Sequence, residues 1–159
     1  MPQFNPSDSH IVDTTYAEGE GRGGYREVLE AARGEGECPF CPANLSKYGN
    51  DVVREVGRWV AIRNRWPYPH AAVHLLLLPL EHIVDISGVL TSDWQDVQGL
   101  IVVLRRDYPT LQVGGALAVR FGTNSGATVR HLHFHLIAPV TNSETGKPHP
   151  GEHVSFPIG

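Results

Sequence analysis

Three histidines alternate with apolar residues in the segment HLHFHLI, which spans residues 131–137. Side chains two apart on a strand point to the same face, about 6–7 Å from one another. We therefore expect a strand over 131–138 in which His131, His133 and His135 line one face and Leu, Phe and Leu enter the core. Imidazole titrates near neutral pH, binds metals and can act as a nucleophile.

The triad alone leaves other interpretations open. Three histidines could lie on a solvated strand face, where polar residues are expected. Two histidines at i and i+2 of a strand could also share one zinc ion, as in a zinc hydrolase whose triad binds the metal directly.

A second candidate site is the pair Cys38 and Cys41, separated by Pro and Phe. A Cys-x-x-Cys pair supplies two of the four ligands of a tetrahedral zinc site. The alternative is a reduced thiol pair or a redox couple. A redox motif usually begins a helix after a strand in a βαβ pattern, and the sequence shows no such pattern here.

Three separate segments resemble the histidine triad (HIT) family. HLHFHLI matches its His-x-His-x-His-x-x signature, NRWPYPHAAVHLLLLPLEH resembles its loop and strand, and SGATVRH resembles the turn before the triad. The resemblance covers roughly residues 38–140. It implies that His133 attacks the α-phosphorus of a nucleotide to form a nucleotidyl-histidine, which water or another acceptor then resolves.

The resemblance also implies roles for other residues. His135 and Thr128 would contact the phosphates, Asn64 the ribose, and His74 would lie near the triad. Asn124, Ser125 and Gly126, in the GTNSG turn, would complete the nucleotide site, where backbone N–H groups could serve as donors. The chain departs from the family pattern at Ala127, where many relatives have Gln, and at Arg120, where many have Asn; Arg120 could itself contact phosphate.

Relatives that carry a Cys-x-x-Cys pair hold zinc with two additional histidines. By this resemblance the ligands here are Cys38, Cys41, His82 and His131, and the zinc is structural because all four positions are filled. His133 and His135 would then stay available for phosphate.

Periodicity predicts the elements that position these residues. We expect a helix over 25–33 that stops at Gly34, and strands over 52–56, 59–63, 73–78 and 116–121. A long helix is expected from a capping box of Ser92 and Gln95 to Pro109. The fold class is therefore α+β, a HIT-like, mostly antiparallel sheet with one long helix and a shorter N-terminal helix.

Residues 1–37 are expected to form a partly loose N-terminal extension and 38–159 the HIT domain. The formal net charge of −4 and the absence of a basic run argue against a nucleic-acid partner. No signal peptide or membrane-spanning run is evident, so we expect a cytoplasmic protein with no membrane partner. The resemblance further implies a homodimer.

The expected function is a nucleotide-phosphate hydrolase acting on phosphoramidates, dinucleoside polyphosphates or adenylated small molecules. One alternative is a nucleotidyltransferase or phosphorylase related to galactose-1-phosphate uridylyltransferase. In that branch Gln replaces the third histidine, so His135 favours hydrolysis. Another alternative is a non-catalytic nucleotide-binding protein.

Overall fold

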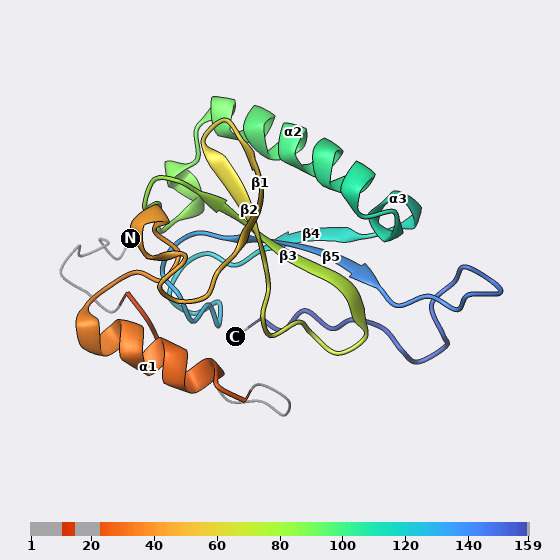
Figure 1. Ribbon diagram of the computed structural model, residues 1–159, viewed down its shortest axis with the longest axis horizontal. Coiled ribbons are helices and arrows are strands. Elements are labelled where there is room, and N and C mark those ends of the chain that lie inside the picture. Colours follow the sequence, from red (N-terminus) through yellow and green to blue (C-terminus); the bar gives the residue numbers. More distant parts are fainter. Residues whose placement is uncertain (1–10, 15–22, 159) are drawn as a thin grey trace.

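A single antiparallel sheet of five strands forms the centre of the computed structural model, which describes residues 11–14 and 23–158. The strand order is β1-β2-β3-β5-β4 (Figure 1). The strands are β1 (Val52–Val56), β2 (Trp59–Arg63), β3 (Ala71–Pro79), β4 (Ala116–Val119) and β5 (Phe134–Pro139). The expected α+β class with a mostly antiparallel sheet is confirmed.

Helices cover the sheet unequally. The long helix α2 (Thr91–Asp107) runs along one face, and α1 (Tyr25–Glu35) lies on the other side of the sheet (Figure 1). Smaller helical turns are α3 (Thr110–Val113), η1 (Pro42–Asn44) and η2 (Ile86–Gly88). Within the described ranges, no helix is both long and apolar enough to cross a bilayer.

Both main helices begin or end differently from the sequence prediction. α1 continues through Gly34 and is capped by Gly36, whose positive φ of 68° is open to glycine at no steric cost. The capping box of Ser92 and Gln95 is wrong, because α2 already begins at Thr91. The Asp93 carboxylate instead accepts the Leu90 N–H at 2.8 Å, which satisfies a donor that the helix leaves unpaired.

The two faces of the sheet differ in chemistry because side chains alternate along each strand. Under α2, alternate residues of β3 and β5 pack against the helix in an apolar core, which includes Val73, Leu75, Leu77, Phe134, Leu136, Ala138, Val97, Leu100 and Leu104. On the opposite face, Leu76 pairs with His135, and His74 lies two residues earlier on β3. The histidines therefore occupy the face that α2 does not cover.

The expected strand over 131–138 begins later than predicted, at Phe134. β3 ends at Pro79, which has no N–H to continue the ladder, and β4 ends at Val119. Leu132 instead donates its N–H to the carbonyl of Ile83, outside any strand, at 2.6 Å. Of the three triad histidines only His135 lies in the sheet, so the predicted strand is too long. The predicted alternation holds, because Leu132, Phe134 and Leu136 enter the core and the rings of His133 and His135 lie 5.0 Å apart.

The described part of the N-terminal extension packs on the rest of the chain. Of the extension expected over residues 1–37, residues 1–10 and 15–22 lie outside the described residues. Val12, however, is fully buried and forms a β-bridge with Val129. Leu29 and Ala32 of α1 join the same apolar cluster as Cys38. This end of the chain therefore lies against the Cys-x-x-Cys segment and the segment just before the triad.

Substitutions on the two faces of α2 should separate core from surface. Leu104 is fully buried, so Leu104→Ala should lower the free energy of unfolding by about 2–5 kcal/mol through lost burial and a residual cavity. Val102 on the same helix is 45% exposed, and Val102→Ala should change the free energy of unfolding by about 0.5 kcal/mol or less. Urea denaturation measures both; equal losses would contradict this packing of α2.

Candidate active site and metal centre

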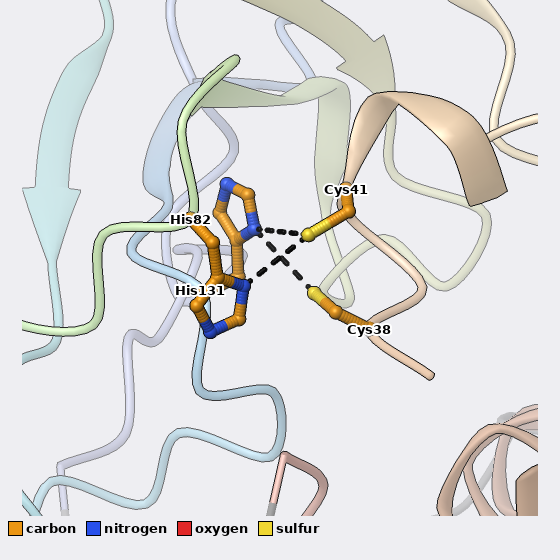
Figure 2. A group of neighbouring side chains, drawn as sticks. All are labelled: Cys38, Cys41, His82 and His131. Atoms are coloured by element: carbon orange, nitrogen blue, oxygen red, sulfur yellow. Dashed lines mark hydrogen bonds between the residues drawn. The ribbon is translucent and has the colours of Figure 1, made fainter. Parts of the chain in front are cut away.

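Two thiols and two imidazoles converge from three segments of the chain (Figure 2). Cys38 and Cys41 come from the turn before η1, His82 from the loop after β3, and His131 from the segment before β5. One ligand atom from each of the four residues lies within 4.8 Å of all the others. The structure thus brings together the four residues that the family resemblance implied as metal ligands.

The spacing of these atoms fits a tetrahedral metal. Nδ1 of His131 lies 3.4 Å from the Cys38 Sγ and 3.7 Å from the Cys41 Sγ, and Nδ1 of His82 lies 3.3 Å from the Cys41 Sγ. Zinc bonds of about 2.0–2.1 Å to nitrogen and 2.3 Å to sulfur hold such ligands about 3.5 Å apart. The donor set of two thiols and two imidazoles therefore fits zinc.

His131 has its ring orientation fixed by the backbone. Its Nε2 lies 2.9 Å from the carbonyl of Pro79 and donates its proton there, so the Nδ1 lone pair faces the thiols. Such an outer hydrogen bond commonly sets the tautomer of a metal-binding histidine. Burial lowers the pKa of His131 to about 4 and raises the pKa of the Cys38 thiol to about 12. The imidazole is thus neutral at pH 7, as a metal ligand must be.

His133 is held in the orientation of a nucleophile. Its Nδ1 lies 2.7 Å from the carbonyl oxygen of His131 and must carry the proton, which leaves Nε2 with its lone pair. The ring is buried and packs edge-on against Phe40. Burial lowers the pKa of His133 to about 4, so the ring is neutral at pH 7.

His135 belongs to a buried histidine pair. Its Nδ1 lies 2.9 Å from Nε2 of His74, whose Nδ1 accepts the N–H of Tyr68 at 3.2 Å. The side chain of Asn64 joins this pair: Nδ2 lies 3.1 Å from Nε2 of His74, and Oδ1 accepts the N–H of Trp66. Asn64, His74 and His135 are therefore brought together.

The other predicted nucleotide contacts lie in one segment just before the triad, residues 124–128. The Thr128 hydroxyl bonds to the hydroxyl of Tyr25 on α1. Asn124 is exposed, whereas Ser125 is buried and donates to the carbonyl of Gly122 at 3.0 Å. Gly126 has a positive φ of 76°, which suits a turn.

A depression beside His133 is lined by both charged groups and backbone. Its walls include Asp13, Arg120, Gly122, Thr123, Arg130 and His133. Sequence reasoning missed Asp13, and it also missed Phe40, Tyr25 and Phe156, whose rings or hydroxyls contact the candidate residues. These residues belong to no recognisable spacing pattern. Only Phe40 lies within a motif, the Cys-x-x-Cys segment, which could have indicated its position beside the site.

Comparisons with known proteins agree with this geometry. Residues 37–149, more than half of the chain, match the family model described as "Scavenger mRNA decapping enzyme C-term binding". An uncharacterized HIT-like protein of Helicobacter pylori is 30% identical over 70 residues, which cover 44% of this chain and 67% of the relative. One from Chlamydia muridarum is 29% identical over 90 residues, covering 55% of this chain and 69% of the relative.

Solved structures show the same likeness. A HIT family hydrolase from Clostridium thermocellum has a TM-score of 0.55 and 30% identity, covering 65% of this chain and 90% of that one. One from Legionella pneumophila has a TM-score of 0.53 and 25% identity, covering 69% and 99% of the two chains. The chain belongs to the histidine triad family, and the matched region is that of the decapping-enzyme C-terminal model.

The tautomer of His133 can be measured directly. At pH 7 the ring should be neutral with its proton on Nδ1, because the carbonyl of His131 accepts that proton and burial holds the pKa near 4. Nitrogen-15 NMR of histidine-labelled protein distinguishes the tautomers, and His133→Asn identifies the resonance. An imidazolium signal, or a proton on Nε2, would contradict the geometry.

Proposed function

We propose that the protein is a nucleotide-phosphate hydrolase that works through a nucleotidyl-histidine intermediate on His133. The observation that carries this proposal is the hydrogen bond from Nδ1 of His133 to the carbonyl of His131, which leaves Nε2 as a neutral nucleophile in a buried site. Membership of the HIT family and the likeness to two HIT family hydrolases support it.

The reaction is a two-step covalent displacement. Nε2 of His133 attacks the α-phosphorus, an N–P bond forms, and the bond from phosphorus to the leaving group breaks. The leaving group takes the electron pair and is protonated from solvent. Water then attacks the same phosphorus and loses a proton to solvent, the N–P bond breaks with its electron pair returning to Nε2, and the nucleoside monophosphate leaves with neutral His133 regenerated. The Nδ1 hydrogen bond stabilises the positive charge that the ring carries in between.

Several substrates and side chains belong to this proposal. Candidate substrates are adenosine phosphoramidates, dinucleoside polyphosphates and adenylated small molecules. Because the matching family model is described by an mRNA decapping enzyme, a cap dinucleotide joins them. Asn64, His74, Thr128, Asn124, Ser125 and Gly126 stay proposed contacts of the nucleotide, and His135 of the phosphates.

The metal cluster argues against the alternative in which the triad binds zinc directly. Of the three triad histidines, only His131 belongs to the cluster of four ligands found among the described residues. His133 and His135 stand outside it. The metal therefore has no place in the proposed displacement, and bound zinc would supply only a structural link between the Cys-x-x-Cys turn and the triad segment.

Assembly as a cytoplasmic homodimer is also proposed, on the family resemblance. The structure supports it with an exposed apolar edge: Leu117 on the edge strand β4 is 43% exposed, and Val113 of α3 is 76% exposed. Unpaired edge strands with apolar side chains are surfaces that a second chain can cover. The HIT domain is proposed to extend over 38–159.

Removal of the nucleophile is the first test. His133→Ala should lower turnover of a fluorogenic adenosine phosphoramidate or a diadenosine polyphosphate by about 10⁴-fold or more while nucleotide binding is retained. His149→Ala, in the exposed tail, is the control and should keep wild-type rates. An acid-labile, labelled nucleotidyl-protein should be trapped from wild type but not from His133→Ala. Wild-type turnover by His133→Ala would rule the mechanism out.

Metal content is the second test. Purified wild type should hold close to one zinc per chain, and Cys38→Ser should lose most of it because a thiolate ligand is removed. The melting temperature should fall as well, since bound zinc would tie together the three segments that carry its ligands. His153→Asn in the tail, as control, should keep both values. A wild type that is metal-free and fully folded would contradict the zinc proposal.

A further inference from the structure

The guanidinium of Arg120, just after β4, is held in one orientation at the depression beside His133. Its Nε and Nη2 donate to the carbonyl of Pro157 at 2.9 and 2.6 Å, and Nη2 donates to the Tyr68 hydroxyl at 2.8 Å. The ring of Phe156 lies 4.1 Å from the guanidinium carbon. The C-terminal tail, which runs back toward the sheet, thus fixes Arg120 (Figure 1).

These bonds use three of the five guanidinium protons and leave the two on Nη1. Nη1 lies 3.3 Å from Nε2 of His135, and within the described residues its second proton meets no protein acceptor. The partners of Arg120 in this part of the chain are a carbonyl, a hydroxyl and an imidazole, with no carboxylate among them. A cation is therefore fixed by neutral groups with one edge left open.

The contact between Arg120 and His135 places the open edge of the guanidinium beside the buried histidine pair. Nη1 of Arg120 lies 3.3 Å from Nε2 of His135, and the other ring nitrogen of His135 lies 2.9 Å from Nε2 of His74. Arg120 and His135 therefore present their polar atoms side by side at the edge of the depression.

The open N–H of Arg120 Nη1 requires an acceptor with free lone pairs. A phosphate oxygen accepts hydrogen bonds from both a guanidinium and an imidazole, and such charge-assisted bonds are about twice as strong as neutral ones. The chain has a formal net charge of −4, so its overall field does not attract an anion. The local cation must supply the attraction.

We propose that Arg120 is a further catalytic residue, which together with His135 binds a non-bridging oxygen of the phosphorus that His133 attacks. The proposal rests on the proposed function for its reaction. Charge builds on that oxygen as the N–P bond forms, and prepositioned donors stabilise the transition state more than the ground state. No bond to Arg120 forms or breaks.

Kinetics test this role. Arg120→Gln should lower kcat by about 10²- to 10³-fold on both the phosphoramidate and the polyphosphate, with KM changed much less. Arg120→Lys keeps the charge but loses the planar fork that Pro157 and Tyr68 hold, so its kcat should lie between those of the glutamine variant and the wild type. Arg106→Gln, exposed on α2, is the control and should keep wild-type values. An unchanged kcat in a folded Arg120→Gln, checked by its melting temperature, would overturn the proposal.

Binding separates this proposal from the proposed function. Calorimetry with AMP should show affinity weakened by about tenfold or more in Arg120→Gln, because a charged hydrogen bond is lost, and unchanged affinity in Arg106→Gln. The affinity for AMP can be measured even if wild type turns over none of the substrates. Absence of turnover would contradict only the proposed hydrolase activity. Equal AMP affinity in wild type and Arg120→Gln, or no AMP binding by wild type, would overturn the role of Arg120.

Discussion

The arrangement of the whole site depends on His131, whose two ring nitrogens and backbone carbonyl each have a defined partner. Its Nε2 donates to the carbonyl of Pro79, its Nδ1 faces the two thiols, and its own carbonyl accepts the proton of His133. The first bond fixes the ring relative to the end of β3, and the last fixes the tautomer of the next histidine. A shift of this one residue would therefore alter both the Cys and His cluster and the orientation of His133.

The end of the β3–β5 ladder explains why His131 can serve both sites. Inside a strand, both its carbonyl and its N–H would be used by neighbouring strands, and the carbonyl would not be available to a side chain two residues later. Because β5 begins only at Phe134, the carbonyl of His131 is available to the ring of His133. His135, one step inside the ladder, is positioned by the register with Leu76 instead. Two residues that look equivalent in sequence are thus held by different means.

The sequence was most informative where a repeated physical pattern acts. Strands 52–56 and 59–63 and the apolar face of α2 follow from periodicity, and the four clustered Cys and His residues follow from the family resemblance. The predictions are wrong where a single local contact determines the end of a helix or strand. The cap of α2 is the Asp93 carboxylate rather than Ser92, and strand β5 starts late because Pro79 ends its neighbour. Hydrophobic periodicity over a window of 11–18 residues does not indicate which single residue caps a helix or ends a strand.

Contacts between residues far apart in the sequence could not be predicted, and several of them lie at this site. The hydroxyl of Tyr25 reaches Thr128, 103 residues away, and the carbonyl of Pro157 orients Arg120, 37 residues away. Both Tyr25 and Pro157 lie outside residues 37–149, the part that the family model matches. The matched part contains the four clustered Cys and His residues, His133 and the pair of His74 and His135. The flanking segments add hydrogen bonds that orient residues of the matched part.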